Sequence, residues 1–286
     1  MTMADSFDEH RPLLFSIAYR MLGTRADAED AVQETFLRWQ AASAEEIKSP
    51  RAYLATVVTR ICLDHFKSAR TRREVYVGPW LPEPVPGAGL SEPANNVELA
   101  ESLTMAFLVV LESLSPSERA AFLLHEVFDY DYTETAEMIG KSEANCRQMV
   151  HRAKEHIASR HRRFDPTREE SQRVTARFLE AAGTGDVTGL MSILAEDAVM
   201  TSDGGGKVRA ALNPVHGADA IARFVIGVVR KNMPPQTIHK ATEFNRQPAF
   251  VSYVDGHPIA VSILDVRDGL VRNLYIVANP DKLQKI

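Results

Sequence analysis

The stretch Thr133-Glu134-Thr135-Ala136-Glu137-Met138-Ile139-Gly140-Lys141-Ser142 begins as a helix, stops at a glycine and restarts at a serine. Glycine is common where a helix ends in the left-handed conformation, and serine is a preferred cap for the next helix. Along that next helix one face is apolar and carries Cys146, Val150, Ala153 and Ile157. The pattern predicts a helix-turn-helix in which Cys146 has a packing role.

The remaining faces of the second helix carry hydroxyl, amide and cationic side chains. Amides and guanidinium groups can read base edges in the major groove, while lysine and arginine bind phosphates. We therefore predict a DNA-binding surface formed by Ser142, Asn145, Arg147, Gln148, His151, Arg152 and Lys154. A solvated helix whose charges only keep it soluble is the alternative, because short helix-turn-helix signals often arise by chance.

Helical spacing surrounds this motif over residues 97–163, and Ser115-Pro116-Ser117-Glu118 supplies a hydroxyl cap, an early proline and a capping-box glutamate. The preceding residues 75–96 are dense in proline and glycine, which neither a helix nor a central strand accommodates. We expect a linker there.

Residues 1–74 return to helical spacing and predict three or four packed helices. Their end is basic, and we predict a second DNA-binding surface formed by Arg51, Arg60, Lys67, Arg70, Arg72 and Arg73. Two basic surfaces joined by a linker favour contact with two separated places on one DNA.

The stretch Asp27 to Trp39 differs, because its first turn is acidic and its later face is aromatic. An acidic surface repels phosphate, so we do not expect this helix to bind DNA. We interpret it as a partner-binding helix that offers Asp30, Gln33, Glu34 and Trp39, with an ordinary surface helix as the alternative.

Residues 167–286 open with amphipathic helices and continue into alternating, β-branched stretches such as Ile259 to Leu264. They predict an α+β unit. Within it, Asp203-Gly204-Gly205-Gly206-Lys207 lacks the spacing of a phosphate-binding loop, and a tight connection between strands explains its glycines.

The composition narrows the class of protein. A chain of 286 residues fits two or three compact units, and its two cysteines provide neither a disulfide framework nor a paired metal-ligand spacing. The net charge of −5 conceals segregated patches. We expect a cytoplasmic protein without metal or cofactor, because the N-terminus is polar and no apolar run approaches a membrane span.

Two segments resemble known sigma-factor domains. Asp27 to Trp39, followed by Ser49-Pro50-Arg51-Ala52-Tyr53-Leu54 to Asp64-His65-Phe66, resembles sigma domain 2. The segment from Leu114 through Lys154 resembles sigma domain 4. Their order and spacing, without a third sigma domain between them, are those of extracytoplasmic-function RNA polymerase sigma factors.

This resemblance implies roles for the segments. The helix from Asp27 would dock on the beta-prime clamp helices of core polymerase, and Ala44 to Ser49 with the helix after it would handle the unwound minus 10 promoter element. Ser142 to Lys154 would read the minus 35 element. Met149 stands where many family members carry a basic residue, which leaves the bases that are read undetermined.

Three further segments resemble signatures of the sigma subgroup with a fused SnoaL-like (polyketide-cyclase-like) domain. They are Trp80-Leu81-Pro82-Glu83-Pro84, Asp203-Gly204-Gly205-Gly206-Lys207 and Asn279-Pro280-Asp281-Lys282-Leu283. The resemblance implies that the C-terminal domain docks on the linker and sets how readily the two sigma domains open. Trp80 could instead pack against its own sigma domain.

We therefore expect two all-α sigma domains, a sigma-2 helical bundle over 1–74 and a sigma-4 helix-turn-helix over 97–163, joined by the linker 75–96. A SnoaL-like α+β cone over 167–286 would follow and would regulate a transcription-initiating sigma factor. A DNA-binding regulator that needs no polymerase, and an enzyme with a DNA-binding appendage, remain as alternatives.

We expect no enzymatic activity. A SnoaL-like cone can use a pocket aspartate or histidine as a base, and the candidates would be Asp203, His216, Asp255 and His257, each more often a turn or surface residue. A small ligand in this domain stays open as a further partner, beside core polymerase and promoter DNA.

Overall fold

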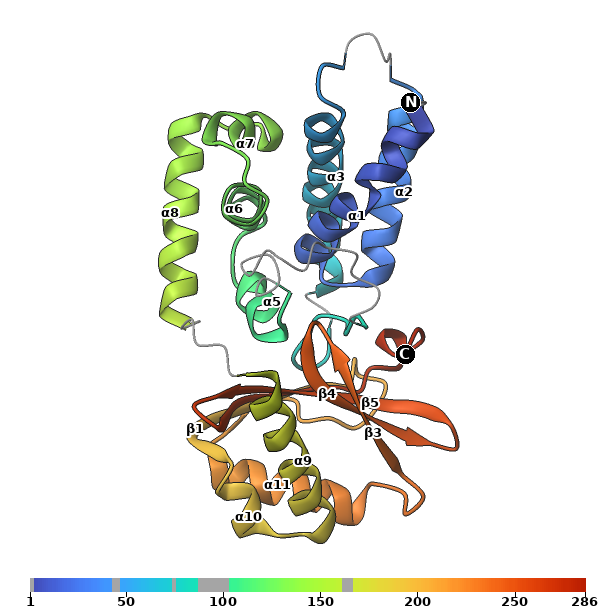
Figure 1. Ribbon diagram of the computed structural model, residues 1–286, viewed down its shortest axis with the longest axis vertical. Helices are drawn as coiled ribbons and strands as arrows, with labels where there is room; N and C mark the ends of the chain where they lie inside the picture. Colours follow the sequence, from blue (N-terminus) through green and yellow to red (C-terminus); the bar gives the residue numbers. More distant parts are fainter. Residues whose placement is uncertain (1–2, 43–46, 74–75, 87–102, 161–166) are drawn as a thin grey trace. The chain divides into compact units, whose positions relative to one another are not determined.

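A computed structural model describes residues 3–42, 47–73, 76–86, 103–160 and 167–286 of the chain. These residues divide into two compact units (Figure 1). The N-terminal unit contains 3–73 and 103–160, and the C-terminal unit contains 76–86 and 167–286. The expected linker 75–96 is thus represented by 76–86, which pack with the C-terminal unit, while 87–96 lie outside the described residues.

The first part of the N-terminal unit has three helices, α1 (Met3–Leu22), α2 (Arg25–Gln40) and α3 (Pro50–Arg73). The turn between α1 and α2 follows from local chemistry, since Gly23 has a φ of +77° and the Thr24 side chain caps α2 by accepting from the Asp27 amide. Buried apolar side chains, among them Leu14, Ile17 and Val58, fill the space between the three helices.

The second part contains α5 (Met105–Glu112), α6 (Pro116–Phe122), the π-helix η3 (Leu123–Val127), α7 (Tyr132–Ile139) and α8 (Glu143–Arg160). The capping box of Ser115 and Glu118 is present. Gly140 ends α7 in the left-handed conformation, so α7 and α8 form the predicted helix-turn-helix. The predicted apolar face of α8 is confirmed, because Cys146, Val150, Ala153 and Ile157 are all buried.

The C-terminal unit combines helices with one six-stranded sheet. Its helices are α9 (Arg168–Thr184), α10 (Val187–Met191) and α11 (Ala218–Lys231). The strands are β1 (Leu194–Asp203), β2 (Val215–His216), β3 (Ile238–Phe244), β4 (Gln247–Val254), β5 (His257–Arg267) and β6 (Leu270–Val277), and the short helix η4 (Pro280–Lys282) follows.

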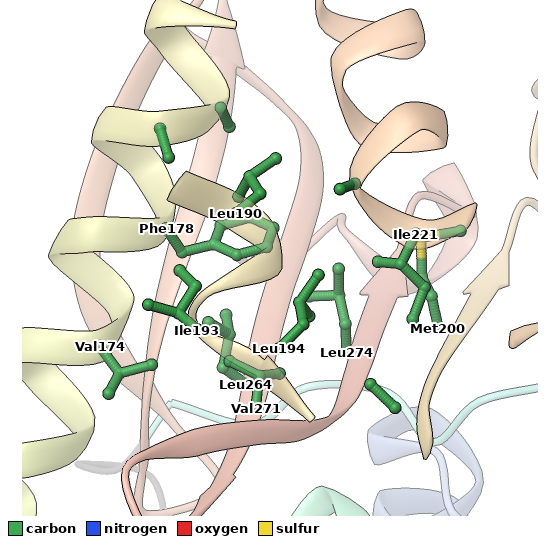
Figure 2. Close-up of a cluster of buried hydrophobic side chains, with 14 of the residues drawn as sticks. Val174, Phe178, Leu190, Ile193, Leu194, Met200, Ile221, Leu264, Val271 and Leu274 are labelled. Atoms are coloured by element: carbon green, nitrogen blue, oxygen red, sulfur yellow. The ribbon is translucent and has the colours of Figure 1, made fainter. Parts of the chain in front are cut away.

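The sheet has the order β2-β1-β6-β5-β4-β3, with β1 and β6 parallel and the other neighbours antiparallel. Tight turns join β3 to β4, β4 to β5 and β5 to β6. Residues with positive φ, such as Asn245 and Gly256, occupy these turns. Helices α9, α10 and α11 lie on one face of the sheet (Figure 1). Their shared core includes Phe178, Leu190, Ile193, Ile221 and Leu274 (Figure 2).

The register assigns neighbouring residues of β1 to opposite faces of the sheet. Ser202 shares a cross-strand row with Ile276, Ser262 and Phe250, and Phe250 belongs to the helix-covered core. Asp203 belongs to the next row, so its side chain points to the other face. That second face binds residues 76–86, and the sheet therefore separates a helix-covered side from a linker side.

Candidate functional site

The carboxylate of Asp203 lies at the centre of the linker side and is fully buried. One oxygen accepts from the Tyr76 hydroxyl at 2.5 Å and the Gly205 amide at 3.0 Å. The other accepts from the Leu81 amide at 3.0 Å and the Lys282 ammonium at 2.7 Å. Burying a carboxylate is costly unless it is paired and hydrogen-bonded, and here it is both. Asp203 thus binds the linker and the C-terminal segment together.

The Lys282 side chain is the cation of this network and is 6% exposed. Its Nζ also donates to the Leu81 carbonyl and lies 4.1 Å from the centre of the Trp80 ring. A desolvated cation above an indole face is a favourable arrangement. The linker is therefore held by its backbone at Leu81 and by its aromatic ring at Trp80.

The glycines after Asp203 allow the linker to approach closely. A methyl group on Gly205 would lie 2.4 Å from Asn279 Nδ2, and one on Gly206 would lie 3.0 Å from Val77 Cβ. Both glycines also have positive φ, near +61° and +71°. Asn279 in turn donates to the Tyr76 hydroxyl at 2.9 Å. Gly205 and Gly206 are therefore required both for the turn and for the close contacts.

The other members of the three predicted segments lie around this network. Residues Leu81 to Val85 are all buried, including Pro82, Glu83 and Pro84. On the surface, Lys207 forms an ion pair with Asp281 at 2.6 Å. Pro280 and Leu283 complete the third predicted segment. Pro280 begins η4, and the Leu283 side chain is 4% exposed. We name this whole set, residues 76–86 with 203–207, 245 and 279–283, the linker dock.

A second anchor of the linker dock was missed by sequence reasoning. The Val85 amide donates to Asn245 Oδ1 at 3.1 Å, and the Asn245 amide donates to the Val85 carbonyl at 2.9 Å. Pro86 pairs with Phe244 beside it. Asn245 is fully buried with a φ of +52°. An asparagine between two strands is typical of an ordinary hairpin turn, so the sequence did not indicate that Asn245 also binds the linker.

Tyr76 must be neutral to donate its hydroxyl hydrogen to Asp203. Burial, followed by the hydrogen bond and the charge of Asp203, holds the pKa of Tyr76 well above its ordinary value of 10.0. The phenol is therefore protonated at neutral pH.

The predicted DNA-binding residues of α8 and its cap lie mostly on an exposed surface, with Asn145 half-buried. Ser142 accepts from the Asn145 amide, and Arg147 pairs with Glu143 at 2.7 Å while covering the Tyr132 ring. Gln148 and His151 are exposed on the same helix.

Two cations of α8 form ion pairs with neighbouring helices of the same unit. Arg152 lies 3.3 Å from Glu118, and Lys154 lies 2.7 Å from Glu126. Met149, at the position where the family resemblance led us to expect a basic residue, is 8% exposed. It belongs to the packed face of α8 and offers no side chain to DNA in this arrangement.

Two predicted DNA-binding arginines of α3 bind main-chain carbonyls in the second half of the N-terminal unit. Arg60 donates to Glu137 O at 2.9 Å and to Met138 O at 3.0 Å. Arg51 donates to Phe128 O at 3.4 Å. Lys67 is exposed and pairs with Asp64. The side chains of Arg70, Arg72 and Arg73 lie outside the described residues, as do residues 43–46 of the expected promoter-melting loop.

The predicted partner-binding helix α2 has an exposed face on which Asp30 and Gln33 lie, with Glu34 half-buried beside them. The assignment of Trp39 to this surface is wrong, because its side chain is 3% exposed and packs against Tyr53. The exposed apolar residue on this face is Leu37, at 53%. Leu37 follows Asp30 and Gln33 at helical spacing, and this spacing could have identified it from the sequence as part of the same face.

None of the four candidate bases lines the cavity that the C-terminal unit contains on its helix-covered side. Asp203 belongs to the linker dock, Asp255 occupies a turn, and His216 and His257 are exposed. Among the described residues, no group of three or more His, Cys, Asp or Glu side chains could hold a metal ion. No helix in the described ranges is long and apolar enough to cross a membrane.

Two family models match the helical parts of the chain, Sigma-70 region 2 over residues 7–72 and Sigma-70 region 4 over residues 104–157. A chain that carries these two regions in this order is of the sigma-factor class. The sigma factor SigJ of Mycobacterium tuberculosis (strain ATCC 25618 / H37Rv) is 39% identical, with 96% of this chain and 91% of SigJ covered. The chain belongs to the extracytoplasmic-function (ECF) RNA polymerase sigma factor family.

Further relatives agree with this assignment. Probable sigma factor SigI of the same organism is 32% identical over 97% of this chain and 93% of its own length. The crystal structure of M. tuberculosis SigJ matches with a TM-score of 0.78 and 37% identity, covering 98% of this chain and 97% of that one. The predicted family and the predicted fold class, two helical sigma domains followed by an α+β domain, are confirmed.

Proposed function

We propose that this sigma factor is regulated by its own C-terminal domain, which holds the segment between the two sigma domains in the linker dock. The observation that carries this proposal is the buried pair of Asp203 and Lys282, since both side chains bind linker backbone. A tethered domain acts at a high effective concentration, so modest contacts suffice to favour one arrangement.

Polymerase binding is assigned in this proposal to α2. Asp30, Gln33 and Glu34 offer polar contacts, and the exposed Leu37 beside them offers an apolar anchor. A small apolar centre within a polar surface is typical of the positions that dominate binding energy. The partner would be the beta-prime clamp helices, as in the family that the chain belongs to.

Promoter binding is assigned to the exposed face of α8 for the minus 35 element and to α3 for the unwound minus 10 element. Arg51 and Arg60 currently donate to protein carbonyls. Arg119 adds a fourth bond to a main-chain carbonyl, from Nη1 to Met21 O at 2.6 Å. For Arg51 and Arg60 to reach DNA, these carbonyls would have to be exchanged for phosphates. We infer that the N-terminal unit opens when it engages polymerase and promoter.

An enzymatic role for the C-terminal domain is not part of this proposal. None of its candidate bases lines the cavity, and the Asp203 carboxylate is bound by the linker, by Gly205 and by Lys282. We place the action of the protein in the cytoplasm, because core polymerase and promoter DNA are there.

The test is run-off transcription with purified core polymerase, using the full chain and a truncation that ends at Phe164. We expect the full chain to confer start-site selection, and the truncation to change the amount of transcript from the same promoter. A pull-down with core polymerase serves as the control for binding. Identical output from both proteins would contradict regulation by the C-terminal domain, and failure of both to bind polymerase would contradict the sigma-factor role.

A further inference from the structure

The helix-covered side of the C-terminal sheet contains a cavity of about 620 Å³. Its lining is predominantly apolar and includes Phe178, Phe224, Val228, Phe250, Leu274 and Ile276. No aspartate or glutamate is among the lining residues, and the lining arginine, Arg209, is exposed. A cavity of this size and character fits a small organic molecule.

One polar group in this cavity has no protein partner. Ser262 is 5% exposed, and its hydroxyl makes no hydrogen bond with any residue in the described part of the chain. The register places Ser262 between Phe250 and Ile276 on the lined face. Because Ser262 lines the cavity, its hydroxyl can exchange one hydrogen bond with a ligand atom placed there.

A second polar group lies on the same face of the sheet, two residues further along the strands. His239 Nδ1 is 2.9 Å from the Ser252 hydroxyl, and both residues line the cavity. Partial removal from solvent lowers the pKa of His239, which favours the neutral imidazole at neutral pH. The sheet face therefore presents neutral hydrogen-bonding groups within an apolar surface.

We propose that the cavity binds a compact, neutral, largely apolar molecule that carries one hydroxyl or carbonyl group, with Ser262 as the hydrogen-bond partner of that group. We further infer that occupancy strengthens the linker dock, an extension that rests on the proposed function. The ligand would thus be a signal that the C-terminal domain reads.

The coupling follows from walls that the cavity and the linker dock share. Val208 and Ala211 line the cavity, while the same loop contacts the linker through Gly206 beside Val77 and through Leu212. A methyl group on Gly78 would lie 3.6 Å from Leu212 Cδ2. A ligand that packs against the loop would hold it in place for the linker, and by linkage a docked linker would favour the ligand.

Two further pairs of neighbours connect the sites. Ser202 lines the cavity and Asp203 binds the linker, and Ala278 lines the cavity while Asn279 binds Tyr76. Each pair is adjacent in sequence, so a shift of the backbone on one side moves a side chain on the other.

Equilibrium dialysis of the full chain against naphthalene, 2-naphthol and 2-naphthoate tests the binding site. We expect 2-naphthol to bind about five-fold more tightly than naphthalene, which is the value of one neutral hydrogen bond. The anion 2-naphthoate should bind no more tightly than 2-naphthol. Equal binding of naphthol and naphthalene would overturn the role of a polar group, and tightest binding of naphthoate would indicate an anion site at Arg209 instead.

The variant Ser262→Ala should abolish the five-fold preference and keep naphthalene binding, because only the hydrogen bond is removed. Ser192→Ala, which changes a serine outside the cavity lining, is the matched control and should keep the preference. Ala260→Leu, which fills part of the cavity, should weaken all three probes. A preference that survives Ser262→Ala would contradict the assignment.

Chymotrypsin cleavage after Tyr76 and Trp80 tests the coupling, because both residues lie in the linker dock. Saturating 2-naphthol should slow this cleavage at least two-fold in the full chain, with a smaller effect on Ala260→Leu, in which the cavity is partly filled, at the same concentration. An unchanged rate would overturn the coupling. Dialysis does not depend on transcription, so a failure of the regulatory proposal would leave the binding result interpretable.

Discussion

The buried pair of Asp203 and Lys282 can be compared with a surface pair in the same linker dock. Lys207 and Asp281 have a similar nitrogen to oxygen separation, but both are about half exposed. Breaking a buried pair leaves an unpaired charge out of water, whereas an exposed pair contributes little. The two lysines therefore offer a matched test of what holds the linker.

We predict that Lys282→Met destabilises the C-terminal unit by about 3–5 kcal/mol and releases the linker, because Asp203 would remain buried without its cation. Lys207→Met should cost less than about 1 kcal/mol. Urea denaturation gives the free energy of unfolding, and chymotrypsin cleavage at Trp80 reports release. Equal effects of the two substitutions would show that burial of the pair is unimportant.

The raised pKa of Tyr76 predicts a pH dependence of linker docking. A folded-state pKa above the unfolded value of 10.0 means that the folded state keeps its proton longer. The stabilisation is complete below pH 10 and decreases as the pH rises beyond that value. Cleavage of the linker should therefore stay constant up to about pH 10 and accelerate above that value.

Tyr76→Phe provides the control for this pH effect. The phenylalanine variant lacks the hydrogen bond to Asp203 but cannot ionise, so its docking should be weaker at pH 8 and less sensitive to alkaline pH. If both proteins showed the same dependence, the ionising group would lie elsewhere.

Several residue roles were predictable and others were not. Asp203, Lys282 and Trp80 were proposed from short segments that resemble a known subgroup. The contact of Asn245 with Val85 was missed, because it joins residues far apart in sequence and Asn245 looks like an ordinary turn residue. Trp39 was misassigned, since an aromatic residue near a helix end reads equally well as core or as surface.

At the scale of helices, α2 and α8 present opposite chemistry. The exposed face of α2 is acidic with Leu37 near its end, and that of α8 is rich in amides and cations. The first suits a protein partner and the second suits DNA.

We predict that Leu37→Ala weakens association with core polymerase about ten-fold, because it removes an exposed apolar anchor without disturbing the fold. The midpoint of thermal unfolding should stay unchanged. Ile238→Ala, another exposed apolar residue at 59%, is the control and should bind polymerase normally. Normal affinity of Leu37→Ala would remove Leu37 from the contact surface.

On α8, Gln148→Ala and Lys154→Ala should have different effects on promoter binding. Gln148 can contact a base edge, so its loss should cost about 1–3 kcal/mol for the cognate minus 35 element and relax its sequence preference. Lys154 would contact phosphate, so its loss should weaken all sequences and lower the salt dependence by about one ion. Salt titrations with cognate and scrambled DNA distinguish these outcomes.

Most helices could be anticipated from caps and periodicity, since these signals are local. Gly140 and the Ser115 capping box fixed two boundaries directly. The carbonyl contacts of Arg51 and Arg60 could not be anticipated, because they join α3 to segments nearly eighty residues away. A basic side chain looks the same in sequence whether it binds a phosphate or a carbonyl.

For the whole molecule, the order of domains followed from the sequence, but the partition of the linker did not. Residues 76–86 belong to the C-terminal unit through partners such as Asp203 and Asn245. Composition marked these residues only as unsuited to a helix or a central strand.

We predict that a truncation ending at Ala278 releases the linker while the sheet stays folded. It removes Asn279 and Lys282 but leaves β6, which ends at Val277. Circular dichroism should retain its strand signal, chymotrypsin should cleave faster at Trp80, and transcript levels should resemble those of the truncation at Phe164. Full-chain levels of transcript would mean that the last residues are dispensable for regulation.

The dock also limits how far the two promoter-reading modules can separate. An extended chain spans at most about 3.3–3.6 Å per residue, so residues 74–102 together could bridge roughly 100 Å. With 76–86 immobilised on the C-terminal sheet, that piece can no longer extend, and 87–102 can add at most roughly 55 Å to it. Fastening a short piece of tether would restrict the spacing of promoter elements that one molecule can span.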